Sequence, residues 1–391
     1  MQSAFIRRRR HRILRNFQQA CEHRNVPMQI IDLVTHSLRL NTHWEDYYRF
    51  GFYRGDMPWS KKSLYVGDMR SYYWPWENNS LKFDRLFIRK TLHKPVLASE
   101  GLPTSRILMK AGALYPINTA EKFATELAKV DRPFVTKLDG GGGGTLNMSF
   151  SPEQSKYRSR DGLVDALEIW RRYQSVIQAG FLVEERVENH PVLAEIHPSS
   201  LNTLRLNMVK TVDGRWHQLR PCLKIGRSKS HIDNISAGGL LAAVDENGLI
   251  TAVYDESGET FDSHPDTKVP IRGKTVPYYQ ESLELAMKAS NVFGFMGTIG
   301  WDIGVTPDGP TIIEGNARWW AEFYQDVLGP FLSPEIAAGL VHRRWWTPWN
   351  KTQMHPNYKR HDNGGIWTRF VAAQYRRKAG RLQRQLSDDS I

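Results

Sequence analysis

The sequence predicts an α+β protein folded into two or three packed lobes. The chain has 391 residues, which is too long for one small domain at roughly 100–200 residues per domain. Hydrophobic residues make up 40% and charged residues 24%, ordinary globular values that exclude wholesale disorder and collagen-like repeats. Segments with strand-like alternation and segments with helical spacing both recur along the chain, so helices and strands are both expected.

Residues 1–83 are expected to form a helical and aromatic-rich lobe. Apolar residues at helical spacing predict helix within residues 1–40. Residues 41–83 hold four Trp and nine Tyr or Phe among Gly and Pro, which predicts an irregular segment. Because aromatic side chains are usually buried, we expect this segment to wrap a core, with a surface that recognises a sugar or a base as the alternative.

Residues 84–180 are expected to form the next lobe. A helix should end at Gly101 and Pro103 and lead through a turn into a strand before residue 110. The β-rich segment 134–137 runs into five glycines and then residues 145–150, which predicts a hairpin with a mobile tip. Residues 161–178 read as an amphipathic helix.

Residues 181–344 are expected to form a further lobe rich in strands. Alternation from Leu204 to Met208 predicts a half-buried strand that directs Arg205 to the less apolar face. The other elements expected here are strands at 181–185, 217–225, 239–245 and 249–254, a helix at 277–293, and a hairpin of residues 297–304 and 310–314. Residues 345–391 are expected to form a basic, aromatic extension that ends in a helix.

The basic charge of the chain lies at its two ends. The net charge is +12, yet residues 1–24 hold seven Arg against one acid, and residues 341–391 hold eleven Lys or Arg against three Asp. These ends are either simply solvated or contact an anionic partner, such as membrane lipid or a polymer like nucleic acid.

Cysteine content and hydropathy predict a cytoplasmic protein. Two distant cysteines, Cys21 and Cys222, exclude a disulfide scaffold and a cysteine-based zinc site, and fit a reducing compartment. No apolar run approaches the length of a membrane-spanning helix, and Arg12 and Arg15 interrupt the only candidate secretory segment.

Three features point to nucleotide chemistry. Lys137 precedes the glycines, whose backbone N–H groups can approach an anion closely while the lysine supplies a point charge. At the end of a later apolar strand, segment 184–187 offers carboxylate and backbone groups to an adenine edge and a ribose. Plain structural alternatives exist for both features, namely a flexible hairpin tip and surface charge.

The third feature is a set of oxygen ligands on one predicted hairpin. Asp302 lies on its first strand, and Glu314 and Asn316, two residues apart, share a face of its second strand. Oxygen ligands of this kind suit Mg²⁺, which binds through carboxylates together with nucleotide phosphates. A capped turn with exposed acids is the alternative.

In this order, the three features resemble the ATP-grasp superfamily over roughly residues 84–320. Segments 197–205, 232–239, 300–302 and 313–316 are most similar to the branch called sugar-transfer associated ATP-grasp. The resemblance implies an ATP-grasp fold, with ATP clamped between two α+β subdomains, 84–180 and 181–344, under the glycine hairpin. It also implies ATP and Mg²⁺ (or Mn²⁺) as cofactors.

The resemblance implies roles for individual residues. Lys137 would hold the α- and β-phosphates, and Arg205 would face the γ-phosphate and an acyl phosphate. The remaining implied roles are phosphate cover by Gly142, Gly143, Gly144 and Thr145; adenine or ribose contact by Glu184, Glu185 and Val187; metal binding by Asp302, Glu314 and Asn316; and assistance at the phosphate end from Lys224, Arg227 and Asn234.

One departure from the family pattern concerns an earlier lysine that contacts the nucleotide. Asp84-Arg85 stands where an Asp-Lys pair would be natural, so the role passes to Lys94 or, as the alternative, to Lys90. No catalytic base is visible in the sequence.

Three functions follow as hypotheses. The first is an ATP-dependent ligase that activates a carboxylate as an acyl phosphate for attack by an amine or another nucleophile, in peptide, natural-product or envelope-glycan biosynthesis. The alternatives are a phosphotransferase of the same fold and a non-catalytic binder of an anionic polymer. The binder hypothesis predicts that the metal trio is dispensable.

Overall fold

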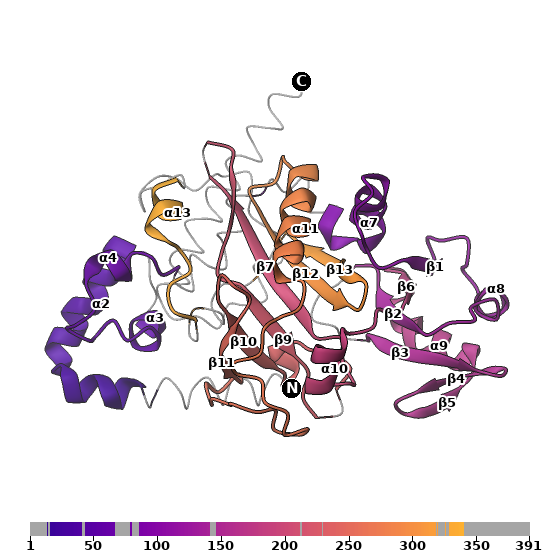
Figure 1. Cartoon of the computed structure of the whole chain (residues 1–391), viewed down its shortest axis with the longest axis horizontal. Coiled ribbons are helices and arrows are strands. Elements are labelled where there is room, and N and C mark those ends of the chain that lie inside the picture. The colour runs from indigo at the N-terminus through magenta and orange to yellow at the C-terminus, as the bar shows by residue number, and fades with distance from the viewer. Residues whose placement is uncertain are drawn as a thin grey trace.

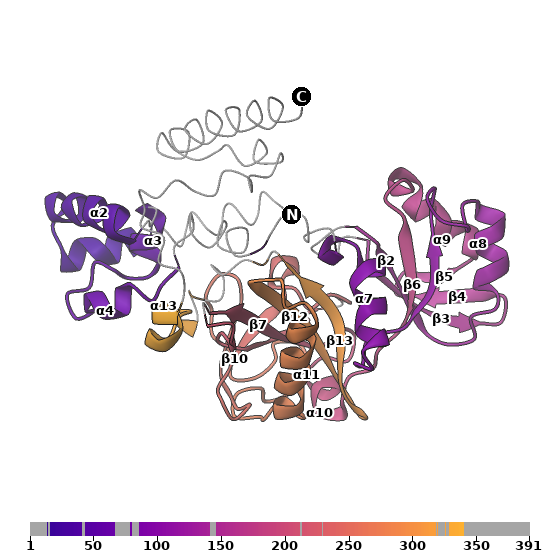
Figure 2. The same cartoon turned by 90° about the horizontal axis from the view of Figure 1, so that it is seen from above.

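The computed structural model describes residues 14, 16–40, 44–66, 79, 86–140, 146–211, 213–228, 230–317, 319, 325 and 328–339. A helical lobe lies at one end, a six-stranded sheet lies at the other, and a seven-stranded sheet lies between them (Figures 1 and 2). The α+β fold class is thereby confirmed. Within the described residues, no helix is long and apolar enough to span a membrane.

The helical lobe consists of α2 (Val26–Leu40), α3 (Trp44–Arg49) and α4 (Trp59–Lys62) around an aromatic core. The buried members of that core are Ala20, Tyr47, Tyr48, Phe50, Phe52, Tyr53 and Tyr65. The prediction of a buried aromatic cluster is confirmed for these residues. By contrast, Trp44 and Trp59 are exposed, and residues 67–78 and 80–85 lie outside the described residues.

The six-stranded sheet is antiparallel throughout, in the order β1-β6-β2-β3-β4-β5. Its strands are β1 (Ile107–Ala111), β2 (Phe134–Leu138), β3 (Met148–Glu153), β4 (Lys156–Ser159), β5 (Gly162–Val164) and β6 (Phe181–Glu185). Helices α8 (Ala120–Leu127) and α9 (Ala166–Tyr173) cover one face, where Phe123 and Tyr173 pack on Phe134 and Phe181. Strand β6 pairs with both β1 and β2, so the strand that begins at Phe181 belongs to the smaller sheet.

The segment expected to be one helix at 161–178 is divided. It contains β5, helix α9 and the 3-10 turn η1 (Gln174–Val176). Asp161 and Gly162 turn the chain from β4 into β5, with Gly162 at a φ of 121°, which favours glycine. The carboxylate of Asp165 then accepts a hydrogen bond from Glu168 N at 2.7 Å and starts the helix.

The larger sheet is also antiparallel and runs β11-β10-β9-β7-β12-β13, with β8 paired to β7. Its strands are β7 (Thr203–Lys210), β8 (Trp216–Gln218), β9 (Cys222–Ile225), β10 (Leu240–Val244), β11 (Ile250–Tyr254), β12 (Thr298–Thr306) and β13 (Gly309–Asn316). The expected strand at 217–225 is therefore two strands, separated at Pro221, which has no backbone N–H to donate to a ladder.

Apolar side chains cover one face of the larger sheet and part of the other. Helices α7 (Lys90–Ser99), α10 (Pro191–Ile196) and α11 (Tyr279–Val292) pack on one face, around Leu204, Leu206 and Trp301. On part of the other face, Val66, Trp319 and residues 328–336, including the start of α13 (Pro334–Gly339), form a second apolar cluster with Val209 and Leu241. Strand β7 is therefore covered on both faces from Asn207 to Val209, where half burial was expected, whereas Arg205 is partly exposed and lines a pocket. The remaining part of this second face is polar.

Candidate active site

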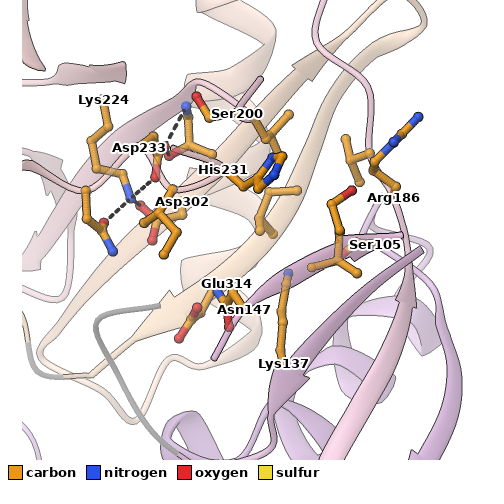
Figure 3. A pocket seen from close by; sticks show the side chains of 18 of the residues that line it. Ser105, Lys137, Asn147, Arg186, Ser200, Lys224, His231, Asp233, Asp302 and Glu314 are labelled. Carbon is orange, nitrogen blue, oxygen red and sulfur yellow. Dashed lines mark hydrogen bonds and ion pairs between the residues drawn. The ribbon is translucent and has the colours of Figure 1, made fainter. Parts of the chain in front are cut away.

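A pocket of about 960 Å³ lies between the two sheets (Figure 3). Lys137 enters it from β2 of the smaller sheet, and Asp302 and Glu314 enter it from β12 and β13 of the larger one. Because side chains alternate along a strand, Trp301 and Ile303 on either side of Asp302 lie in the core of the larger sheet while Asp302 faces the pocket. Of the residues predicted for the site, nine line the pocket: Lys137, Glu185, Val187, Arg205, Lys224, Asn234, Asp302, Glu314 and Asn316.

Two predicted residues, Lys94 and Glu184, do not line the pocket and lie behind Lys137. Glu184 is 1% exposed and receives Lys94 Nζ at 2.7 Å on one oxygen and Lys137 Nζ at 2.9 Å on the other. Ser105 joins the same group, accepting a hydrogen bond from Lys94 Nζ at 2.6 Å and donating to Glu184 at 3.2 Å. The carboxylate of Glu184 is thus occupied in orienting two lysines.

The charges of this cluster are strongly coupled. Burial opposes the ionisation of Glu184, yet the adjacent charges of Lys137 and Lys94 prevail and lower its pKa to about 2. Burial lowers the pKa of Lys94 to about 8, because one shared carboxylate only partly compensates the loss of water. Burial also acts against Lys137, but the attraction of Glu184 prevails and raises its pKa, so its positive charge is maintained at the pocket wall.

Asp302 is the centre of a second cluster, on the larger sheet. Its Oδ1 lies 3.1 Å from Arg205 Nε and 2.9 Å from Lys224 Nζ. The pairing of β12 with β7 places Asp302 directly opposite Arg205, and its pairing with β13 places it opposite Glu314. Burial opposes ionisation of Asp302, but the two cations prevail and lower its pKa.

Lys224 also reaches the segment that follows β9. Its Nζ lies 3.7 Å from Asp233 and donates a hydrogen bond to Asn234 Oδ1 at 3.3 Å. The other oxygen of Asp233 accepts hydrogen bonds from both the N–H and the hydroxyl of Thr203. Burial raises the pKa of Asp233, and the negative charge of Asp302 adds to this effect against the attraction of Lys224. The sequence analysis did not assign a role to Asp233, although it lies within the recognised segment 232–239.

The predicted metal ligands lie together at the pocket wall. Asn316 Nδ2 is 3.4 Å from Asp302 Oδ2, and Glu314 Oε1 is 3.2 Å from Lys90 Nζ. Among the described residues there is no group of three or more His, Cys, Asp or Glu side chains arranged to hold a metal. The trio nevertheless offers two carboxylates and an amide, which are hard oxygen donors suited to Mg²⁺ when phosphate oxygens complete the shell.

Helix α7 presents both candidate lysines to this region. Lys90 and Lys94 are four residues apart and therefore share a face of the helix. Lys90 pairs with Glu314 of the larger sheet and lines the pocket, whereas Lys94 pairs with Glu184 of the smaller sheet. The geometry thus places Lys90, the alternative from the sequence, at the pocket wall, and Lys94 behind it.

The start of α7 is tied to the base of the glycine segment through Asp139. This fully buried carboxylate accepts hydrogen bonds from the N–H and the hydroxyl of Thr91, at 3.0 and 2.9 Å, and from the hydroxyl of Tyr115 at 2.5 Å. The backbone oxygen of Asp139 also accepts a hydrogen bond from Lys90 N at 3.2 Å. Asp139 therefore positions the helix that carries Lys90, a role that the sequence analysis missed.

Among the described residues predicted for the site, Arg227 also does not line the pocket. Arg227 pairs with Asp255 at 3.3 Å and stacks over the ring of Phe261. Gly142, Gly143, Gly144 and Thr145 lie outside the described residues. The pocket is also lined by Arg186, Ser105 and His231, which the sequence analysis did not single out (Figure 3).

The sequence matches the family model described as sugar-transfer associated ATP-grasp over residues 70–338. The chain belongs to this family. The resemblance inferred from residues 84–320 is confirmed, and the match extends beyond it at both ends. No curated protein matches the sequence of this sugar-transfer associated ATP-grasp protein.

Several solved structures align with this chain at low identity. They include L-amino acid ligase from Bacillus licheniformis, at 14% identity over 60% of this chain and 41% of that chain, with a TM-score of 0.36. D-alanine–D-alanine ligase from Bacillus anthracis matches at 14% identity over 65% and 62%, with a TM-score of 0.35. Biotin carboxylase from Campylobacter jejuni matches at 14% over 71% and 50%, with a TM-score of 0.41. The ATP-grasp chain spans less than two thirds of each, and no residue role is taken from them.

Proposed function

We propose that this protein is an ATP-dependent ligase that activates a carboxylate as an acyl phosphate for attack by an amine or another nucleophile. The observation that carries the proposal is the convergence, across one pocket, of Lys137 from the smaller sheet and the Asp302–Glu314–Asn316 trio from the larger sheet. Membership of the ATP-grasp family supports ATP as the ligand of this pocket.

The charge of the pocket explains why a divalent cation would be needed. Five cationic side chains line it, Lys90, Lys137, Arg186, Arg205 and Lys224, and so do five carboxylates, Glu185, Glu188, Asp233, Asp302 and Glu314. Such a balanced wall has little net charge with which to attract a triphosphate. A bound Mg²⁺ would supply positive charge between the carboxylates and the phosphates and would polarise the transferred phosphoryl group.

The chain's own residues then divide into two groups. Lys137, held by Glu184, would bind the α- and β-phosphates near the centre of the pocket, and Glu185 and Val187 would lie along the nucleoside. Arg205 and Lys224 adjoin Asp302, so both would face the phosphoryl group that is transferred. Fixed cations at that position stabilise the charge that develops in the transition state.

Binding of the nucleotide can be tested without knowing the other substrates. Calorimetry with a non-hydrolysable ATP analogue should show binding that requires Mg²⁺ and that is lost in Glu314→Ala. The matched control is Glu188→Ala, which removes a carboxylate that lines the pocket outside the trio and should bind the analogue with Mg²⁺ as the wild type does. Tight binding that needs no metal and survives Glu314→Ala would contradict the proposed site.

The reaction itself is tested by a product assay over paired acid and amine candidates. ADP release that depends on both partners supports a ligase. ADP release with a single phosphorylated acceptor would instead show a phosphotransferase of the same fold and would overturn the proposal. Anionic-polymer binding that is unaffected by loss of the trio, with no ADP release, would indicate the non-catalytic binder.

A further inference from the structure

His231 is a pocket-lining side chain with an unused acid–base atom. Its Nδ1 lies 2.9 Å from the backbone oxygen of Ser199. Because a carbonyl oxygen only accepts hydrogen bonds, Nδ1 carries the hydrogen, and Nε2 of a neutral ring then has a free lone pair. Nε2 has no hydrogen-bond or ion-pair partner among the described residues, and the ring lies at the pocket wall (Figure 3).

The carboxylates that line the pocket are, by contrast, all paired with cations. Each has a lysine or arginine nitrogen within 4 Å. The pairs are Glu185 with Arg132, Glu188 with Arg186, Asp233 and Asp302 with Lys224, and Glu314 with Lys90. An adjacent positive charge stabilises the ionised form of a carboxylate and makes it a weaker base. His231 therefore offers the basic atom of the described pocket wall that no cation neutralises.

Asp233 is the strongest competitor for the role of a base, because burial raises its pKa. Its Oδ2 accepts hydrogen bonds from both the N–H and the hydroxyl of Thr203, and its Oδ1 faces Lys224 at 3.7 Å. Asp233 is also only 8% exposed, whereas His231 is exposed. Both oxygens of Asp233 are thus used within the protein, and Nε2 of His231 is open to a ligand.

The contacts of neighbouring residues hold the segment that carries His231. His197 Nε2 donates a hydrogen bond to the backbone oxygen of Ser228 at 2.8 Å, and His197 Nδ1 lies 2.9 Å from Ser200 Oγ. His197 is 2% exposed, so this link is internal. Together with the contact between His231 and Ser199, it ties the segment to residues 199 and 200 at two points. A base is effective only where its lone pair is held toward the reacting proton.

His231 adjoins the end of the pocket at which the transferred phosphoryl group is expected. It lies two residues before Asp233, whose carboxylate faces Lys224, and Lys224 is 2.9 Å from Asp302. Consecutive Cα atoms are about 3.8 Å apart, so the Cα atoms of His231 and Asp233 are separated by less than about 8 Å. The ring therefore lines the same part of the pocket as the cations that would hold an acyl phosphate.

We propose that His231 is the general base of the second step, in which an amine attacks the acyl phosphate. The inference rests on the ligase function proposed above and narrows its nucleophile to an amine. A primary amine is largely protonated at neutral pH and attacks only after it has lost a proton. His231 Nε2 would accept this proton and pass it to the solvent.

The remaining changes in bonding balance the step. The nitrogen forms its bond to the acyl carbon, the bond from that carbon to the phosphate oxygen breaks, and the phosphate leaves with the electron pair. An ammonium nitrogen loses two protons when it becomes an amide. His231 takes the first, and the second leaves with the phosphate.

The test compares two nucleophiles that differ in their need for a base. The acid is the one for which the product assay shows ADP release, and the nucleophile is either its amine partner or hydroxylamine, which is largely unprotonated at neutral pH. His231→Asn keeps a side-chain N–H for the contact with Ser199 but has no basic nitrogen. Amide formation in His231→Asn should fall about a hundredfold or more, because a positioned base commonly contributes that much. Hydroxamate formation should fall far less.

A matched control carries the same change outside the pocket. His23 is exposed in the helical lobe, where it stacks on Tyr53, and His23→Asn should leave both rates as in wild type. A variant that is unfolded would lose amide and hydroxamate formation alike and would have a lowered thermal midpoint. In that case His231→Gln, which also lacks a basic nitrogen, repeats the comparison.

Three results would overturn the inference. Amide formation at the wild-type rate in the His231 variants would show that the amine loses its proton without His231, and would leave the ligase function intact. Equal losses with the amine and with hydroxylamine in a folded variant would show that His231 positions the substrates and is not a base. Absence of ADP release in wild type, or a single phosphorylated acceptor, would remove the ligase function and the role of His231 with it.

Discussion

Replacing Glu184 by Gln tests the buried charge cluster behind the pocket. The change keeps the shape of the side chain but leaves Lys94 and Lys137 without their shared counter-charge. Both lysines are held within 3 Å of the carboxylate in a site that is 1% exposed. Loss of the carboxylate charge should therefore lower the free energy of unfolding of the whole protein, and not only rearrange the two lysine side chains.

The size of the effect follows from the charge coupling. A fall in the pKa of Glu184 from 4.5 to about 2 corresponds to about 3 kcal/mol in favour of the charged form in the folded protein. Removing one partner of a buried ion pair commonly costs a similar amount, about 3–5 kcal/mol. We therefore expect Glu184→Gln to lower the free energy of unfolding by about 3 kcal/mol at neutral pH.

The pH dependence has a definite sign. Because the pKa of Glu184 is lowered on folding, its contribution is complete above pH 4.5 and is lost as the pH falls toward about 2. The pKa of Lys94 is lowered from 10.5 to about 8, so this side chain loses its proton at a lower pH in the folded state than in the unfolded state. The free energy of unfolding therefore rises as the pH increases from about 8 to 10.5. The difference in the free energy of unfolding between wild type and Glu184→Gln should accordingly become smaller above neutral pH, because a neutral Lys94 needs no counter-charge.

Urea unfolding of wild type and variant at neutral and mildly alkaline pH measures both quantities. Glu185→Gln is the matched control, because Glu185 is a more exposed neighbour whose pairing with Arg132 at 3.4 Å contributes little. A loss of less than about 1 kcal/mol in Glu184→Gln, or a deficit that widens with rising pH, would refute the assigned role of the cluster.

Four other substitutions test the pocket and its supports. Arg205→Ala should lower ATP turnover by about a hundredfold or more with a much smaller loss of ATP affinity, whereas Lys137→Ala should first weaken ATP binding. Steady-state kinetics measures the turnover and calorimetry measures the affinity. Normal turnover in Arg205→Ala would show that Arg205 does not act on the transferred phosphoryl group. Gly300→Ala should lower both the thermal midpoint and the ATP affinity, because the added Cβ would lie 2.7 Å from Asn207 Oδ1 and 3.0 Å from Arg205 Nη1. An unchanged midpoint and affinity would show that these side chains move aside at little cost. Asp139→Asn should lower the urea concentration at which half of the protein is unfolded. The buried carboxylate accepts hydrogen bonds from the first turn of α7, whereas the amide that replaces it would also donate. An unchanged urea midpoint would contradict the role of Asp139 in anchoring α7.

Local pattern was sufficient for most of the strands and for the prediction that Asp302, Glu314 and Asn316 lie together, as they do at the pocket wall. A strand such as β12 is long and apolar, so Asp302 stands out in its sequence, and the two-residue spacing of Glu314 and Asn316 places both on one face. The structure pairs Asp302 with Glu314 across the hairpin, as the spacing predicts. The division of the segment at 161–178 was missed because three residues of strand and a short capped helix give no periodicity that distinguishes them from one helix.

Spacing alone could not choose between the lysines of α7. Lys90 and Lys94 lie on the same face of one helix, and only the packing of that helix between two sheets directs the first to Glu314 and the second to Glu184. The same holds for Glu184 itself, which the sequence analysis expected beside the nucleotide. Glu184 lies at the end of β6, and this end faces the interior because β6 pairs with β1 on one side and β2 on the other. These pairings join residues that are far apart in the sequence.

The sequence by itself determined the family, the alternation of apolar and polar residues along each strand, and the oxygen-rich hairpin, because these depend on residue type and on short spacings. Tertiary structure alone decided which charges meet. Whether a carboxylate faces a pocket, as Asp302 does, or neutralises a buried lysine, as Glu184 does, depends on what covers the strand on that side. The residues that cover a strand come from another part of the chain. The free energy of burying a charge depends on the hydrogen-bond and ion-pair partners that those residues provide.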